Sequence, residues 1–421
     1  MNVVIIGSGG REHAICKKIK ESPKSSQIFC IPGNAGTHSI AQNVDIKIND
    51  FKSIKEFCLK RKIELLIVGP EQPLVDGIVD YFNDTKIKIF GPNKIASQLE
   101  GSKIFTKKIC EKYNIPTADF RIFQSLEDTK EFLNTAEFPL VIKADGLAAG
   151  KGVYVCKNFN DSIVAAEEIF GGKFGVTKHL LIENFLMGEE MSYFVICDGE
   201  NYQFLGTAQD HKRVKEGDLG KNTGGMGCYS PSRLFNHELA KKINDNIINP
   251  TLNAIKKLGT TYKGFLYVGL MIKDGDPYLI EFNVRMGDPE CQTILPLLEN
   301  DLIEIFDDCC QGKLKKGGIR LNNKKSICIV LCSKGYPEQY EKNVQINGLN
   351  NLLLKKNQYI FHAGTKLENN NILACGGRVL NFVSLTDDFK NSRNDVIKLI
   401  KQLNWKNGFF RKDIGHRVID L

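Results

Sequence analysis

The chain has 421 residues, of which 42% are hydrophobic and 25% charged, and its formal net charge is +8. This composition is typical of a globular protein with about two to four domains, and no apolar run approaches the ~20 residues that a membrane helix needs. Lysine and arginine are spread along the chain without dense basic runs, so we expect small anionic partners, no nucleic acid and no membrane. Thirteen cysteines without metal-binding spacing predict reduced thiols and a cytoplasmic protein.

The first hundred residues alternate short β-rich runs with helical patterns. This alternation predicts a doubly wound α/β domain with a parallel sheet, in which ligands bind beyond the carboxyl ends of the strands. The expected strands are residues 3–6, 27–31, 63–68 and 87–90.

A glycine turn, G-S-G-G-R-E-H at residues 7–13, follows the first expected strand and opens a helix. Free backbone N–H groups at a helix start favour an anion. Glu12 stands where a dinucleotide fingerprint has its third glycine, which argues against a nicotinamide-dependent oxidoreductase and favours a single phosphate on a small sugar. Alternatively, the glycines serve only a tight turn.

The next segment has a helical pattern at residues 94–113, followed by a buried strand that Lys143 interrupts. A buried lysine is costly without an anionic partner, so Lys143 is a candidate phosphate ligand. The glycine-rich loop at residues 146–152, basic at Lys151, is typical of a cover over phosphates. It lacks the Walker pattern, which argues against a P-loop nucleotide hydrolase.

Residues 209–227 follow two further expected strands and combine charges of both signs with a glycine cluster. Such a segment suits a zwitterionic or anionic small molecule, although a plain surface loop has the same composition.

The stretch L-I-E-F-N-V-R-M-G-D-P-E at residues 279–290 begins with the return strand, residues 279–284, of an expected hairpin that turns at residues 274–275. In a strand, Glu281, Asn283 and Arg285 project to one face and the apolar residues to the other. A carboxylate and an amide oxygen on one face suit Mg²⁺, which completes its shell with water and substrate phosphates. An exposed polar strand face explains the spacing equally well.

After residue 318 the pattern changes to antiparallel strands, expected at residues 327–332, 359–364 and 374–383, and a helix at 388–403. This predicts a C-terminal α+β domain with a mixed or antiparallel sheet.

Taken together, the motifs resemble the ATP-grasp ligases and, among them, the phosphoribosylamine–glycine ligase family of purine biosynthesis. The resemblance covers nearly the whole chain. The motifs are G-S-G-G-R-E-H, P-G-N-A-G-T, V-G-P-E, L-E-G-S-K, V-I-K-A-D-G-L-A-A-G-K-G, Q-D-H-K-R, N-T-G-G-M-G, E-F-N-V-R-M-G-D-P-E, F-H-A-G-T-K-L and R-K-D-I-G.

The resemblance implies an N-terminal substrate domain at residues 1–102, an ATP-grasp domain at 103–318 with a lid subdomain at about 117–190, and a C-terminal domain at 319–421. It implies ligation of glycine to 5-phosphoribosylamine through glycyl phosphate, with ATP as co-substrate and Mg²⁺ or Mn²⁺ as cofactor. Another carboxylate–amine ligase of this fold with a different acceptor is the alternative. We expect a monomer or weak homo-oligomer.

The resemblance also implies roles for individual residues. Arg285, Asp210 and Asp288 would be catalytic, and Glu281 and Asn283 would hold the metal. The ATP-binding set would be Lys103, Lys143, Gly150, Lys151, Gly152, Glu183, Leu186 and Glu190. The substrate-binding set would be Gly9, Gly10, Arg11, Asn34, Thr223, Gly224, Gly225 and Met226.

Overall fold

In the computed structural model, which describes residues 1–148, 152–175, 177–315 and 317–419, the N-terminal region is a five-stranded parallel sheet of order β3-β2-β1-β4-β5. The sheet confirms the predicted doubly wound pattern and adds the short strand β3. Its strands are β1 (Val3–Gly7), β2 (Ile28–Pro32), β3 (Gln42–Asn43), β4 (Leu65–Val68) and β5 (Lys88–Phe90).

The central strand β1 is buried on both faces, which is why its sequence is continuously apolar. Val3 and Ile5 pack into one hydrophobic cluster, whereas Val4 and Ile6 pack into another. The helices of this region are α1 (Gly10–Lys20), α2 (Phe51–Lys60), α3 (Glu71–Asp76) and α4 (Ile78–Tyr81).

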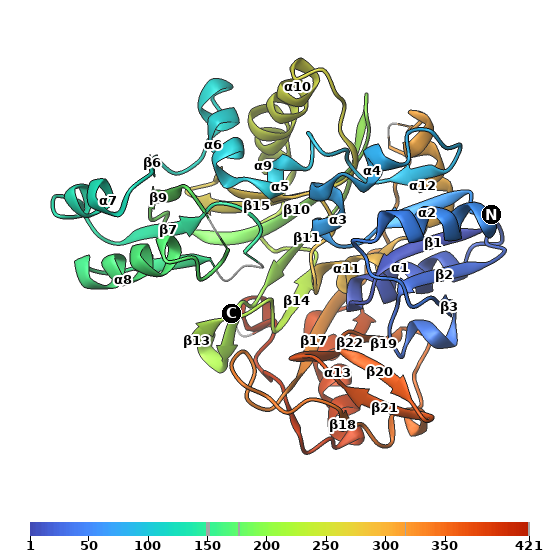
Figure 1. Cartoon of the computed structure of the whole chain (residues 1–421). Helices are drawn as coiled ribbons and strands as arrows, with labels where there is room; N and C mark the ends of the chain where they lie inside the picture. The colour runs from blue at the N-terminus through green and yellow to red at the C-terminus, as the bar shows by residue number, and fades with distance from the viewer. Residues whose placement is uncertain (149–151, 176, 316, 420–421) are drawn as a thin grey trace.

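A separate four-stranded antiparallel sheet projects from the rest of the molecule, at the left of Figure 1. Its order is β6-β9-β7-β8, and α7 (Leu126–Leu133) and α8 (Phe159–Phe170) pack against it around a small apolar core. The strands are β6 (Phe120–Phe123), β7 (Leu140–Ala144), β8 (Val153–Cys156) and β9 (Leu180–Asn184).

The largest sheet has nine antiparallel strands and runs from the middle of the chain into its C-terminal region. Strand β14 (Gly227–Ser230) joins the two parts because it pairs with β11 on one edge and with β17 on the other. The remaining strands are β10 (Glu189–Asp198), β11 (Tyr202–Asp210), β15 (Lys263–Lys273), β16 (Asp276–Asn283), β17 (Lys325–Ser333), β19 (Gln358–His362), β22 (Arg378–Thr386) and β23 (Gly408–Phe409).

The helix predicted at residues 94–113 is two helices, α5 (Gln98–Gly101) and α6 (Lys103–Lys112). Ser102 separates them because its backbone is extended and its hydroxyl caps α6 by accepting from the Phe105 N–H. The other helices here are α9 (His237–Ile243), which continues through a π-helical turn (Asn244–Ile248) into α10 (Asn249–Lys257), then α11 (Glu290–Ile294) and α12 (Leu302–Gln311).

The strand predicted at residues 374–383 is wrong as a single element. Gly376 lies against Gly364, so the chain turns there and divides the run between two sheets. The small sheet has the order β18-β21-β20, formed by β18 (Val344–Gln345), β20 (Thr365–Glu368) and β21 (Asn371–Ala374).

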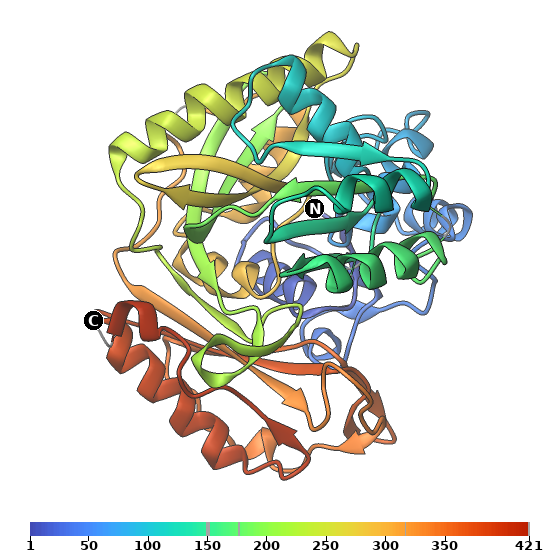
Figure 2. The ribbon, with the colours of Figure 1, turned by 90° about the vertical axis from the view of Figure 1, so that its left-hand side faces the viewer.

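The last long helix, α13 (Phe389–Leu403), lies along the outer face of β17 and β22, as Figure 2 shows, and α14 (His416–Ile419) follows it. In the part of the chain that the structure describes, no helix is long and apolar enough to cross a membrane.

Candidate active site

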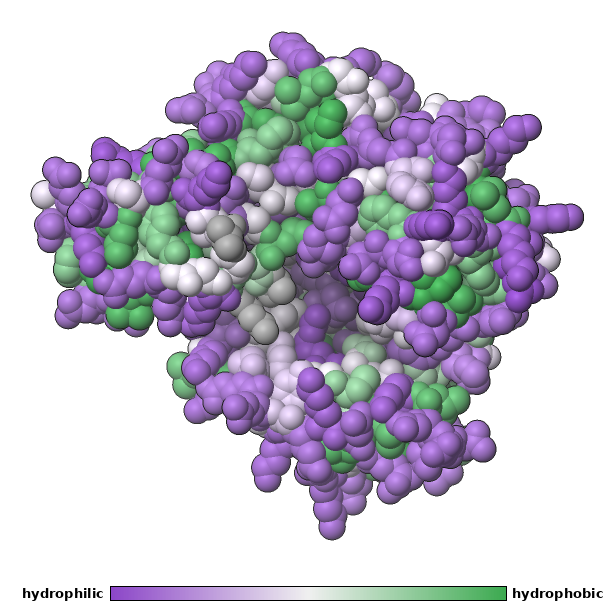
Figure 3. All heavy atoms as spheres, in the orientation of Figure 1, coloured by the Kyte–Doolittle hydropathy of each residue, from purple (hydrophilic) through white to green (hydrophobic). Residues whose placement is uncertain are grey.

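The N-terminal sheet, the four-stranded sheet and the C-terminal region surround a hollow whose interior is hydrophilic (Figure 3). A pocket lies over the large sheet, where four neighbouring strands and the segment after β11 contribute side chains. Its lining is Glu190, Met191, Ser192, Asp210, Lys212, Tyr267, Gly269, Leu270, Ile280 and Glu281.

Strand β16 brings the predicted metal ligands Glu281 and Asn283 to the end of the β15–β16 hairpin. The strict alternation that we predicted is wrong at Ile280, which lines the pocket together with Glu281. A β-bulge is the reason, because Gly269 pairs with Glu281 while Leu270 pairs with Leu279, leaving Ile280 as an extra residue.

The guanidinium of Arg285 lies between two carboxylates that the sequence reasoning did not assign to the site. Its Nε is 3.1 Å from Glu71 and its Nη2 is 2.8 Å from Glu100. Glu71 begins α3 beyond the carboxyl end of β4, within the V-G-P-E motif. That position in a parallel sheet was the signal that could have identified it. Arg285, which follows β16, therefore joins the end of this strand to α3 and α5.

Lys143 of β7 has the anionic partner that its burial requires. Its ammonium lies 2.7 Å from a carboxylate oxygen of Glu183 on β9, and Lys107 of α6 lies 3.3 Å from the same oxygen. All three side chains are at most 7% exposed. Two cations on one carboxylate leave a net positive charge in this cluster.

Lys103 also lies at this loop, since its ammonium donates to the Gly146 carbonyl at 2.9 Å. Burial lowers the pKa of Lys103. Gly152 is the last residue of the loop, and its carbonyl accepts from the Ala144 N–H of β7. Gly150 and Lys151 lie outside the described residues.

The segment after β9 leads from Glu183 through the half-buried Leu186 to Glu190 at the start of β10. Glu190 forms an ion pair of 2.6 Å with Lys212, a pocket residue that the sequence reasoning missed. The charge of Lys212 is the main factor that lowers the pKa of Glu190. Lys212 occurs in the Q-D-H-K-R motif, two residues after Asp210, and that spacing on an extended chain could have identified it.

Asp210 ends β11, and its carboxylate accepts from the His211 N–H at 2.7 Å. Burial, followed by the neighbouring carboxylate of Glu290, raises the pKa of Asp210 to about 8. Glu290 is 3% exposed, accepts from Ser192 and was also missed. A Cβ at Gly225 would lie 2.9 Å from the Asp210 carboxylate, and the φ of +110° there favours glycine.

The other members of the predicted segment 223–226 fix its path. Thr223 donates to the Lys212 carbonyl at 2.8 Å and accepts from the Gly225 N–H at 3.0 Å. The Met226 side chain is fully buried near Cys332. Substrate binding by this segment stays a prediction. It concerns Thr223, Gly224 and Gly225, because the Met226 side chain is buried.

Arg378 of β22 connects two predicted site segments and was not identified from the sequence. Its Nη1 donates to the Gly224 carbonyl and to the Asp288 carbonyl, the latter at 2.6 Å, and lies 3.3 Å from the Asp288 carboxylate. Arg378, followed by Arg11, favours the charged form of Asp288, whose pKa is lowered despite burial.

The glycine turn before α1 is occupied by the protein's own carboxylate. Glu12 accepts from the Gly9 N–H at 2.6 Å and from Arg11 Nε at 2.8 Å, and it fills the space beside Gly7 and Gly69. Glu12 thus stands where the pyrophosphate of a dinucleotide would lie. This geometry agrees with the argument against a dinucleotide site.

Gly10 and Asn34 have contacts within the protein. A Cβ at Gly10 would lie 2.3 Å from Asn381 Nδ2 and 2.5 Å from Gln292 Nε2, so close packing requires this glycine. The Asn34 amide donates to the carbonyls of Ser8 and His362, and its oxygen accepts two backbone N–H groups. Their contribution to substrate binding stays a prediction.

The small four-stranded sheet and the larger antiparallel sheet together form an ATP-grasp fold. Biotin carboxylase from Campylobacter jejuni, 16% identical, shares the fold with a TM-score of 0.73 over 95% of this chain and 91% of that one.

The particular family follows from closer relatives. Three family models match in order: phosphoribosylglycinamide synthetase N domain at residues 1–100, ATP-grasp (A) domain at 101–291 and C domain at 326–417. The chain belongs to the phosphoribosylglycinamide synthetase family.

The full length of the chain is matched by proteins named phosphoribosylamine–glycine ligase. Those from Caldanaerobacter subterraneus and Haemophilus influenzae are 42% and 43% identical, over 99% and 100% of this chain and 99% of each relative. The crystal structure of the phosphoribosylamine–glycine ligase from Thermotoga maritima is 32% identical, with a TM-score of 0.85 over 98% of this chain and 100% of that one.

Proposed function

We propose that the chain is a phosphoribosylamine–glycine ligase, which uses ATP to join glycine to 5-phosphoribosylamine and releases glycinamide ribonucleotide, ADP and phosphate. The observation that carries the proposal is the match to all three family domains in order, over the full length of relatives with this name. Glycine's carboxylate attacks the γ-phosphate of ATP, and the amine of phosphoribosylamine then displaces phosphate from glycyl phosphate.

ATP lies between the four-stranded sheet and the large sheet in this proposal. Lys103 and Lys143 bind its phosphates, helped by the loop that includes Gly150, Lys151 and Gly152. The adenine contacts the segment from Glu183 to Leu186. Glu190 accepts from the ribose hydroxyls. The excess positive charge around Glu183 supports the phosphate part of this assignment.

Glu281 and Asn283 would hold a divalent metal, Mg²⁺ or Mn²⁺. A carboxylate and an amide oxygen at the end of one strand fit such an ion, because hard cations take few protein oxygens when phosphates supply the rest. When bound, the metal neutralises charge on the transferring phosphoryl group. In the described part of the chain, no cluster of three or more His, Cys, Asp or Glu side chains could hold a metal instead.

The remaining side chains orient the two substrates. Arg285 stabilises the transferring phosphoryl group, and Asp210 and Asp288 orient the amines. Such catalysis works by positioning and charge neutralisation and needs no protein nucleophile. The sugar phosphate contacts Gly9, Gly10 and Arg11. The remaining substrate-binding residues are Asn34, Thr223, Gly224, Gly225 and Met226.

We further propose domain boundaries near residues 102 and 318, a cytoplasmic location, and a monomer or weak homo-oligomer. The break at Ser102 between α5 and α6 supports the first boundary.

ADP release from MgATP tests the function when glycine and freshly prepared phosphoribosylamine are supplied together or singly. We expect turnover only with both. Turnover with glycine but a different amine would support the alternative, an ATP-grasp ligase with another acceptor. Binding of ATP without ADP release under all conditions would overturn the ligase assignment.

A further inference from the structure

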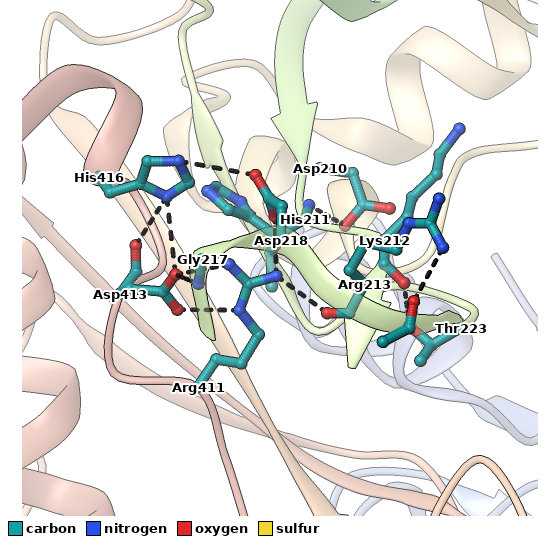
Figure 4. A network of polar contacts seen from close by, with 12 residues as sticks. Asp210, His211, Lys212, Arg213, Gly217, Asp218, Thr223, Arg411, Asp413 and His416 are labelled. Atoms are coloured by element: carbon teal, nitrogen blue, oxygen red, sulfur yellow. Dashed lines mark hydrogen bonds and ion pairs between the residues drawn. The ribbon is translucent and has the colours of Figure 1, made fainter. Parts of the chain in front are cut away.

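A second charged cluster, outside the lining of the pocket, contacts the chain segment that follows Asp210 (Figure 4). We call Asp218, Arg411, Asp413 and Arg417 the C-terminal cluster. Three of its members come from residues 411–417, and Asp218 lies in the turn between β12 (Arg213–Lys215) and β13 (Leu219–Asn222). None of the four is among the described residues that line the pocket.

Arg411 is the centre of the C-terminal cluster and is only 1% exposed. Its guanidinium lies 2.9 Å from Asp218, and two of its nitrogens donate to Asp413 at 2.8 and 2.7 Å. The nitrogen that contacts Asp218 also donates to the Arg213 carbonyl at 2.9 Å. Arg411 therefore fixes the backbone at the end of the segment 210–213.

Arg417 fixes the other end of the same segment. It donates to the Asp218 carboxylate at 2.7 Å and to the carbonyl of Asp210 at 3.3 Å. Asp218 thus accepts from both arginines, which ties the two backbone contacts into one network. The network is partly buried, since Arg411 is 1% exposed and Asp218 and Arg417 are 28% and 25% exposed. Ion pairs of this kind give little net stability compared with apolar packing, so the positions that they fix are more informative than their energy.

His211 supplies a third connection to residues 411–417. It is fully buried, its Nε2 accepts from the Gly415 N–H at 3.3 Å, and its Nδ1 therefore carries the hydrogen and lies 3.3 Å from the Gly227 carbonyl. Burial, followed by the charges of Arg417 and Arg411, lowers its pKa to about 3, so the ring stays neutral. On an extended chain, His211 points away from the side on which Asp210 and Lys212 lie.

We propose that Arg411, Arg417 and Asp218 are positioning residues, which hold the backbone from Asp210 to Arg213 so that the Asp210 carboxylate and the Lys212 ammonium face the pocket. The proposal rests on the proposed ligase function. It assigns a role in catalysis to a C-terminal segment that is distant in sequence from every predicted site residue. Because a misplacement of about 1 Å can cost about 100-fold in rate, loss of this network should lower turnover strongly.

The test compares Arg417→Met with Lys412→Met in the full chain. Both remove one positive charge from the same segment, but the Lys412 side chain is exposed and takes no part in the C-terminal cluster. We expect kcat to fall about 100-fold in Arg417→Met while the variant stays folded at the assay temperature, and to stay unchanged in Lys412→Met. Wild-type kcat in Arg417→Met would overturn the proposal.

A double-mutant cycle separates positioning from a merely structural role. If Arg417 acts through Asp210, Arg417→Met should lower kcat much less in an Asp210→Asn background than in the wild type. Losses that multiply in full would contradict the proposal. Should Arg417→Met not fold, Asp218→Asn takes its place, with the same two outcomes. Absence of ligase turnover in the wild type would instead refute the proposed function.

Discussion

At the scale of single residues, Glu281 is the side chain whose charge the proposed metal site depends on. Replacing it by the isosteric amide in Glu281→Gln should lower kcat about 100- to 1,000-fold, as removal of a preorganised electrostatic group does, and raise the Mg²⁺ concentration required for half-maximal rate. Steady-state rates across a Mg²⁺ titration measure both. Asp276→Asn is the matched control, because Asp276 lies on the same strand but pairs with Lys242 at the surface. An unchanged Mg²⁺ dependence in Glu281→Gln would refute the metal assignment.

Replacing Lys143 tests whether its ammonium binds a phosphate of ATP. In Lys143→Met, Glu183 keeps Lys107 at 3.3 Å, so the fold should survive while one phosphate contact is lost. We expect kcat/KM for ATP to fall about 100-fold or more, measured as ADP release. Lys130→Met serves as the control, since Lys130 lies in the same small subdomain and pairs with Glu167 in solvent. Equal values of kcat/KM for the two variants would show that Lys143 does not bind the ATP phosphates.

Among single residues, the sequence identified those whose side chain does not suit the predicted element, such as a charged residue in an apolar strand. Lys143 in an apolar strand could be predicted to have an anionic partner, because an unpaired buried charge is too costly. Lys212, Glu290 and Arg378 carry no such conflict in their local sequence. Glu290 and Arg378 lie beside Asp210 and Asp288 only because α11 contacts both β11 and β22 in the fold, which local pattern cannot show.

At the scale of elements, alternation and periodicity predicted where strands and helices lie but not where they are interrupted. The bulge at Ile280 depends on the pairing of β16 with β15, and the break at Ser102 depends on a cap that the helical pattern of residues 94–113 conceals. In both cases a tertiary or capping interaction outweighs the local pattern.

Helix α13 offers a prediction at this scale, because its apolar face covers β17 and β22. Leu399 is 3% exposed, so Leu399→Ala should lower the free energy of unfolding of the C-terminal region by about 2–5 kcal/mol. The neighbouring Lys398 is exposed, so Lys398→Ala should change the free energy of unfolding little. Urea unfolding followed by circular dichroism gives both values. A loss in Leu399→Ala no larger than in Lys398→Ala would show that α13 adds little to the fold.

At the scale of the whole molecule, the parallel N-terminal sheet could be predicted because β1, β2 and β4 are buried and read as continuous apolar runs. The nine-stranded sheet could not. Its continuity depends on β14 pairing with β17, about a hundred residues later in the chain. This long-range pairing joins the central and C-terminal regions and brings the C-terminal cluster next to Asp210.

The contact between the N-terminal and C-terminal regions should be sensitive to acid. His13 of α1 accepts from the backbone N–H of His362 on β19 at 2.8 Å, and the two rings are buried side by side. Burial, followed by the neighbouring His362, lowers the pKa of His13 to about 3, and burial lowers that of His362 to about 4. Both rings are therefore neutral in the folded protein over the whole range in which they would titrate in the unfolded chain.

The sign of the effect follows from proton binding. Below its ordinary pKa of about 6.5, each histidine binds a proton in the unfolded chain but not in the folded protein, so stability is full above that pH and falls as the pH is lowered toward the folded-state pKa. When the pH is lowered from 7.5 to 5.5, the contribution of His13 to the free energy of unfolding should fall by about 1.4 kcal/mol. Because other groups titrate in this range, the contribution is isolated by urea unfolding of the wild type and of His13→Gln at both pH values. His38→Gln, which changes an exposed histidine, should keep the wild-type pH dependence. If the free energy of unfolding of His13→Gln falls with pH as steeply as that of the wild type, His13 is already protonated in the folded protein. Its contact with His362 is then not the acid-sensitive point.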